Sequence, residues 1–196
     1  MCNSDSTPWD EKRKTNRGAP MANVRIIIAF LAVTSLLLAV LQRQGATLVN
    51  DEAPYGIVSL ELAGDADKAR AIAAAWETEG KTATAIRNIR LDFLLIPFYS
   101  ILLYMACGSL ATYKTSRHER IGTWIAFACL LAGIFDVFEN LTMTATLRGH
   151  IGAVGAAATS LLATAKFAIL GTAILYILAT SARRLFRSQG KELRTA

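Results

Sequence analysis

The sequence predicts an all-α membrane protein, a bundle of four transmembrane helices with a helical extracytoplasmic loop between the first and second. Apolar residues make up 53% of the 196-residue chain and gather into four blocks, with most charged residues between them. A helix needs about 20 predominantly apolar residues to cross a bilayer core roughly 30 Å thick. The blocks approach or exceed this length, whereas a soluble core would alternate polar and apolar positions along each element.

The apolar blocks place the membrane domain at residues 24–182. Residues 1–23 are predicted to be a disordered cytoplasmic tail, with Met21 as an alternative start, and residues 183–196 a basic cytoplasmic tail. A signal peptide is the alternative interpretation of the first block. However, the apolar run of this block is longer than a usual signal core, and no good Ala-x-Ala site follows it before Gln42. A retained helix is therefore favoured. The predicted spans are about 24–41, 89–112, 121–147 and 153–182.

The distribution of basic residues predicts the orientation. Of 21 lysines and arginines, 13 lie in the N-terminal segment, the 113–120 loop and the C-terminal segment, whereas the 42–88 loop is net acidic. The positive-inside rule then places both termini in the cytoplasm and the 42–88 loop outside the cell (inner) membrane. The net charge of +6 is explained by anionic lipid headgroups, so we expect no nucleic-acid partner.

The loop between the first two spans contains a predicted amphipathic helix. Asp65 can cap a helix that continues through about Glu77. We expect this helix to lie on the membrane surface and partly cover the bundle, with Ile72 and Trp76 contacting the bilayer or a partner. The preceding stretch, 56–62, is predicted to form a short helix or a strand. The apolar face of the longer helix consists of Ala66, Ala69, Ile72, Ala73 and Trp76.

Several polar residues lie inside the apolar blocks. A charge at membrane depth costs several kcal/mol unless it is paired, so such residues usually face the bundle interior. In the third span, Asp136 and Asn140 end a stripe of small residues that favours close helix packing. The stripe is Gly122, Ala126, Cys129, Gly133, Asp136 and Asn140, and the predicted buried polar cluster is Asp92, Asp136, Glu139, Asn140 and Lys166.

The charges in this cluster do not balance. Three carboxylates against one ammonium leave two excess negative charges if all are ionised. The alternatives are a protonated carboxyl group, an arginine (Arg87, Arg90 or Arg148) reaching in from the edge, or a bound cation. The favoured interpretation is an interhelical ion pair between Asp136 and Lys166 that fixes helix register. A site for a proton, a cation or a polar headgroup is the competing interpretation.

No catalytic residue and no cofactor is predicted. The histidines, His118 and His150, fall in loops, which excludes a bis-histidine haem between the spans, and the identity of any metal stays unknown. The Gly-x-Ser-x-Gly, His-Glu-x-x-His and phosphate-binding glycine motifs are missing from the sequence. We therefore expect a non-catalytic accessory or structural membrane component rather than an enzyme. The alternatives are a small ion- or proton-coupled transport protein and a membrane enzyme acting on a lipid headgroup in the outer leaflet.

The expected partners are the lipid bilayer and either another membrane protein or a second copy of this chain. The pattern Leu91-Asp92-Phe93 in one span, Asp136-x-x-Glu139-Asn140 in the next and Lys166 in the last resembles small four-helix bacterial integral membrane proteins of unknown function. The resemblance spans roughly residues 55–180. It implies no activity.

Overall fold

A computed structural model describes residues 19–111, 116–150 and 152–195. Over those ranges the chain is all-α and contains no strand. Four of its helices are long and apolar enough to cross a membrane, which confirms the predicted fold class. These helices are α2 (Ala19–Gly45), α5 (Thr82–Ala111), α6 (Ser116–Leu147) and α7 (Ala153–Thr195).

The helices extend beyond the spans predicted from apolar runs. Helix α2 begins at Ala19, α5 begins at Thr82, and α7 continues to Thr195, through the segment predicted to be a basic tail. An apolar run marks only the part of a helix that suits a bilayer, whereas alanine, arginine, lysine and glutamate extend a helix into water. Residues 1–18 of the predicted N-terminal tail lie outside the described residues.

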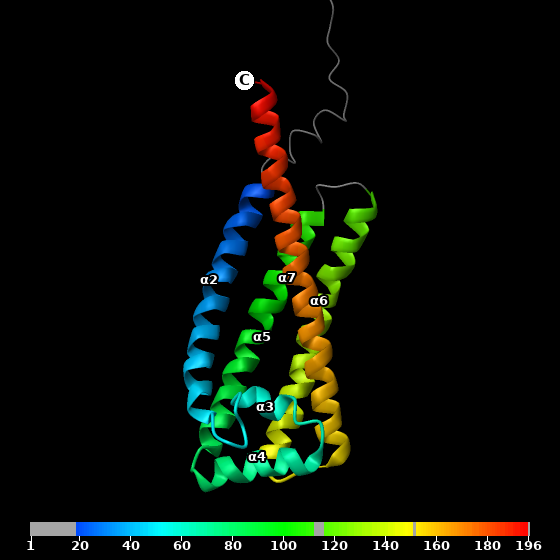
Figure 1. The fold of residues 1–196 in the computed structure, drawn as a ribbon. Coiled ribbons are helices and arrows are strands. Elements are labelled where there is room, and N and C mark those ends of the chain that lie inside the picture. The colour runs from blue at the N-terminus through cyan, green and yellow to red at the C-terminus, as the bar shows by residue number, and fades with distance from the viewer. Residues whose placement is uncertain (1–18, 112–115, 151, 196) are drawn as a thin grey trace, which may run out of the picture.

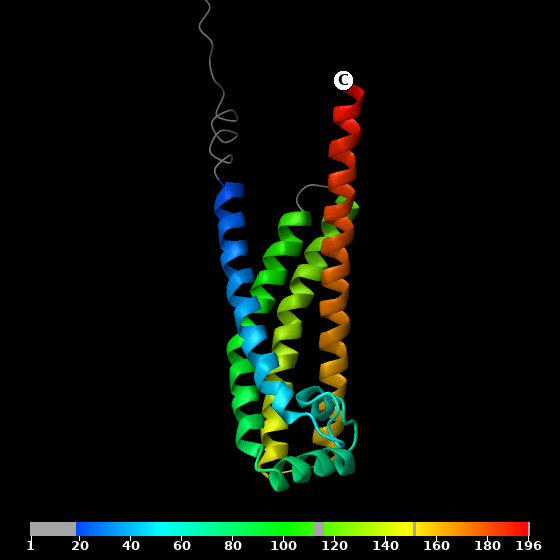
Figure 2. The same ribbon diagram turned by 60° about the vertical axis from the view of Figure 1, so that its left-hand side comes forward.

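Three short elements connect α2 to α5 and lie at one end of the bundle. They are η1 (Ala46–Leu48), α3 (Ile57–Glu61) and α4 (Ala66–Thr78), which we call the cap. Helix α4 lies across the ends of the long helices, with α3 between it and the bundle interior (Figures 1 and 2). The opposite end carries the start of α2 and the end of α7 (Figure 1).

Local sequence explains how the cap is built. Asp65 is the N-cap of α4, since its Oδ1 accepts a hydrogen bond from the Lys68 amide at 2.8 Å, as predicted. Gly56 precedes α3 with a φ of 58°, and a Cβ there would lie 2.9 Å from the carbonyl oxygen of Gly45. Only glycine therefore fits where the chain folds back on the end of α2. The stretch 56–62 thus contains a short helix, not a strand.

Helices α5, α6 and α7 form the packed part of the bundle, and α2 packs mainly on α5 (Figure 2). The inner face of α2 is a narrow seam. In it, the ring centroid of Phe30 lies 5.6 Å from that of Phe98 on α5. Near its end, Asn88 Nδ2 donates to the carbonyl oxygen of Leu41 at 2.9 Å. The partly buried residues of this seam are Ile27, Phe30, Thr34, Leu37 and Leu41, at 3,4 spacing.

The small-residue stripe of α6 lies where the sequence predicted. All six of its positions, from Gly122 to Asn140, are buried. At Gly122 a Cβ would come within 2.8 Å of the Cβ of Ala111 on α5, so the missing side chain permits the observed approach of the two helices. Small residues that allow backbones to come close are the usual means of packing helices in membranes.

The prediction that Ile72 and Trp76 contact the membrane surface or a partner is wrong. Both side chains are 0% exposed and belong to an apolar core with Leu48, Ile89 and Met143. The Trp76 indole Nε1 donates to the carbonyl oxygen of Leu48 at 2.8 Å. An amphipathic stripe requires an apolar surface but does not specify lipid or protein, and here the ends of α5, α6 and α7 supply it.

Candidate functional site

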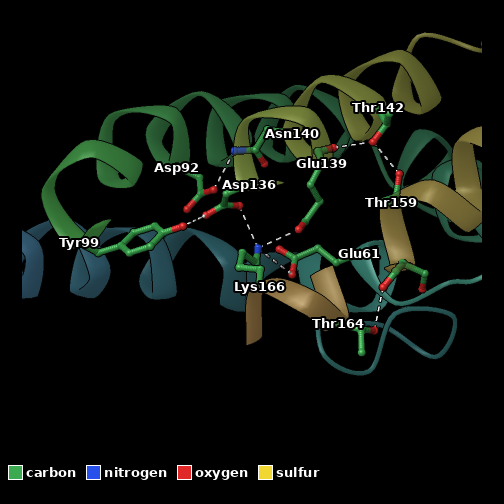
Figure 3. Close-up of polar contacts among 11 residues, drawn as sticks. Glu61, Asp92, Tyr99, Asp136, Glu139, Asn140, Thr142, Thr159, Thr164 and Lys166 are labelled. Carbon is green, nitrogen blue, oxygen red and sulfur yellow. Dashed lines mark hydrogen bonds and ion pairs between the residues drawn. The ribbon is translucent and has the colours of Figure 1, made fainter. Parts of the chain in front are cut away.

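A cluster of charged residues lies inside the bundle beneath the cap, with Lys166 of α7 at its centre (Figure 3). The Lys166 Nζ donates to Asp136 Oδ1 and to Glu139 Oε1, each at 2.9 Å. Asp136 and Glu139 are three residues apart on α6, which places both carboxyl groups on one helix face. The residues that form this charge cluster are Glu61, Asp92, Tyr99, Asp136, Glu139, Asn140 and Lys166.

Helix α5 contributes two further members. The Tyr99 hydroxyl donates to Asp136 Oδ2 at 2.7 Å, so both oxygens of that carboxylate accept hydrogen bonds. Asp92 Oδ2 accepts a hydrogen bond from Asn140 Nδ2 at 2.8 Å, which connects α5 to α6. The structure therefore brings together all five residues that the sequence assigned to the buried polar cluster, although Asp92 joins through Asn140.

A pair of threonines continues the contact between α6 and α7 toward the cap. The hydroxyl oxygens of Thr142 and Thr159 lie 2.6 Å apart. The Thr142 hydroxyl also lies within hydrogen-bond distance of the backbone carbonyl oxygen of Glu139 on its own helix. The Thr159 hydroxyl lies within the same reach of the carbonyl oxygen of Gly155. The two helices are thus joined by polar contacts at Lys166 and again two turns nearer the cap.

Glu61 of α3 is the member that sequence reasoning missed. Its Oε2 lies 3.7 Å from Lys166 Nζ, and the residue is 8% exposed. The sequence places Glu61 in the polar loop, where it counts as one of several solvent-exposed acids. The available signal was its position between Leu60 and Leu62, since a charge inside a short apolar stretch is atypical of a solvated loop.

Glu61 and Glu79 show how differently the cap treats two glutamates. Burial raises the pKa of Glu61 above its ordinary value of 4.5; the attraction of Lys166 opposes this increase and repulsion from Asp136 adds to it. Exposed Glu79 accepts hydrogen bonds from Lys81 and Asn50, which lower its pKa. Glu61 therefore takes up a proton at higher pH than an ordinary exposed glutamate does.

The cluster carries more negative groups than the sequence indicated. It contains four carboxyl groups, those of Glu61, Asp92, Asp136 and Glu139, and the single ammonium of Lys166. The three arginines considered as counter-charges, Arg87, Arg90 and Arg148, are exposed, and Arg87 donates to Thr84 instead. Across the described ranges no group of three or more His, Cys, Asp or Glu has a metal-binding arrangement. The position where three of the carboxyl groups converge is occupied by the lysine ammonium.

Two carboxylate oxygens of the cluster lack a hydrogen bond. Among the described residues, Glu61 Oε2 and Glu139 Oε2 are buried and have no hydrogen-bond partner. The cluster is also enclosed, because the side chains of Lys166, Asp136 and Glu139 are only 6%, 4% and 0% exposed. Its polar groups therefore interact with one another beneath the cap rather than with solvent.

Comparison of the chain with protein-family models, with characterised proteins and with solved structures gives no match. The resemblance to small four-helix bacterial membrane proteins thus stays a prediction from the sequence. Any functional conclusion depends on the geometry of the charge cluster and its cap.

Proposed function

We propose that this multi-pass membrane protein is a non-catalytic accessory or structural component, in which the charge cluster fastens the cap to the membrane bundle. The observation that carries the proposal is the position of Lys166, which joins Glu61 of α3 to Asp136 and Glu139 of α6 from a third helix, α7. A buried ion pair of this kind fixes which helix faces meet, because any other register would leave a charge unpaired in an apolar interior.

The enclosure of the cluster supports this role over catalysis. A lipid headgroup or another substrate must reach the reacting groups, and the central side chains are at most 6% exposed beneath the cap. Lipid is the partner that α2 favours, since apolar residues such as Ile28, Leu31 and Leu36 are exposed along it. Association with a membrane protein or a second copy stays a prediction.

Proton flux tests the proposal against its strongest competitor, a proton-coupled transport protein. That competitor is favoured by the four carboxyl groups around one ammonium. Proteoliposomes with a pH-sensitive dye inside and an imposed pH difference should show the same dissipation rate as protein-free liposomes. A faster rate that Glu139→Gln abolishes, and that the exposed-site control Glu52→Gln retains, would replace the structural role with transport.

The orientation of the chain in the membrane can be tested by labelling single cysteines. We propose that both termini face the cytoplasm and that the cap lies outside the cell (inner) membrane, from the basic-residue asymmetry. The labelled chain has Cys2, Cys107 and Cys129 replaced by alanine. Tyr55 lies in the turn that precedes α3 of the cap and is 77% exposed, so Tyr55→Cys should react with an impermeant thiol reagent in intact cells. Arg183→Cys, at the opposite end, should react only after the cells are permeabilised. The reverse pattern would invert the topology.

A further inference from the structure

We propose that Glu61 and Glu139 form a proton-binding site, in which one proton shared between the two carboxyl groups holds α3 of the cap against the bundle. The proposal goes beyond the structural role suggested above and does not require transport. It starts from two observations. The cluster holds four carboxyl groups and one ammonium, and each of these two glutamates has a buried oxygen without a hydrogen-bond partner.

Full ionisation would leave the cluster with three excess negative charges in an apolar interior. An unpaired buried charge is so costly that the group takes up a proton instead. Asp136 needs no further donor, because one of its oxygens accepts from the Lys166 ammonium and the other from the Tyr99 hydroxyl. Asp92 accepts from Asn140 and is only partly buried. The remaining pair is Glu61 and Glu139.

The geometry of this pair suits a shared proton. Glu139 Oε1 and Glu61 Oε2 approach the same ammonium nitrogen, at 2.9 and 3.7 Å, and their side chains point toward each other from α6 and α3 (Figure 3). Two neighbouring carboxylates cannot both ionise easily, so one of them retains its proton. A protonated carboxyl group donates one hydrogen bond, so a proton on one glutamate gives its neighbour the donor that it lacks.

Loss of the proton acts on α3 first. Deprotonation sets the Glu61 carboxylate against those of Glu139 and Asp136, and α3 is a five-residue helix in the cap, whereas α6 spans the bundle. The charged and titratable groups around the pair are Lys166 from α7, Asp136 from α6, and Asp92 and Tyr99 from α5. Burial raises the pKa of Glu61 above its ordinary value of 4.5. The contribution of the Glu61 proton to cap attachment is therefore fully present below pH 4.5 and is lost as pH rises through the higher pKa of the folded protein.

Infrared spectroscopy detects the proton directly. Purified protein in detergent near neutral pH should show the carbonyl stretch of a protonated carboxylic acid, shifted in heavy water. Glu61→Gln and Glu139→Gln should each remove or weaken this band, and the exposed-site control Glu52→Gln should leave it unchanged. A wild-type spectrum without the band overturns the proposal, as does a band that persists in both variants. A missing band together with stabilisation by sodium at constant ionic strength would assign the site to a cation instead.

Thiol labelling of the cap provides the second readout and tests pH dependence. Ser59 on α3 is 7% exposed, so Ser59→Cys should react only when α3 leaves the bundle. Its labelling rate, normalised to that of the exposed thiol in Tyr55→Cys, should rise by up to about tenfold per pH unit, the slope for one released proton. Adding Glu61→Gln should flatten this dependence. A normalised rate that does not change with pH in the parent chain, or that changes equally in the Glu61→Gln chain, contradicts the proposal. If a glutamine variant fails to fold, the pH dependence of the normalised labelling rate in the parent chain still tests the proposal.

Discussion

Replacing Lys166 by methionine is expected to lower the free energy of unfolding by about 3–5 kcal/mol, the scale for removing one partner of a buried ion pair. Methionine preserves much of the side-chain length but removes the charge. Asp136 and Glu139 then lose a hydrogen bond each, and Glu61 loses its nearest cation. Thermal or denaturant unfolding in mild detergent measures the loss. Lys68→Met, at an exposed position on α4, is the matched control and should change stability by about 0.5 kcal/mol or less.

Adding Asp136→Asn to Lys166→Met should restore part of the lost stability, because a neutral pair needs no counter-charge. The four variants of this cycle give the coupling energy between the two positions. Recovery will be incomplete if Glu139 and Glu61 still lack a cation, and adding Glu139→Gln should then recover more. Strict additivity of the two single substitutions would mean that α6 and α7 do not meet at this contact. A loss for Lys166→Met no larger than that for Lys68→Met would mean the same.

Sequence alone predicts the membrane-spanning part of this fold well, because the bilayer imposes strong rules. Apolar run length marks the spans, and the 4,3 spacing of small residues on α6 identifies the face that is buried. The same rules locate most of the cluster. Asp136 and Lys166 stand out because a charge within an apolar run requires a partner. Their pairing in the structure follows from depth and helix face, both of which can be read from residue spacing.

The sequence does not predict how the cap folds back, because no comparable rule governs a polar loop. Glu61 resembles its acidic neighbours in the loop, and only the turn at Gly56 brings α3 beneath α4 and into the bundle. The stripe containing Ile72 and Trp76 indicates an apolar environment correctly. It does not say whether that environment is lipid or protein, since both exclude water equally well.

The second large loss of stability is expected at Trp76, through which α4 packs against the bundle. Trp76→Ala should lower the free energy of unfolding by about 3–5 kcal/mol, because it removes a fully buried aromatic side chain and leaves a cavity between α4 and the bundle. Trp76→Phe keeps most of the volume but leaves the Leu48 carbonyl oxygen without the indole donor. Its expected cost is smaller, about 1–3 kcal/mol. Unfolding in detergent measures both losses, and protease sensitivity of residues 46–78 reports on the cap itself.

The matched control is Trp124→Ala on α6, whose side chain is 72% exposed and faces away from the protein core. The two tryptophans lose the same atoms on substitution and differ in what surrounds them, so the comparison isolates packing by protein. Trp124→Ala should leave both the unfolding transition and the protease sensitivity of the cap close to wild type. A similar loss for both variants would mean that lipid or detergent, rather than the ends of α5, α6 and α7, covers the apolar face of α4. The apolar face of α4 would then lie on the membrane surface, and the packing that holds Glu61 beside Lys166 would be absent.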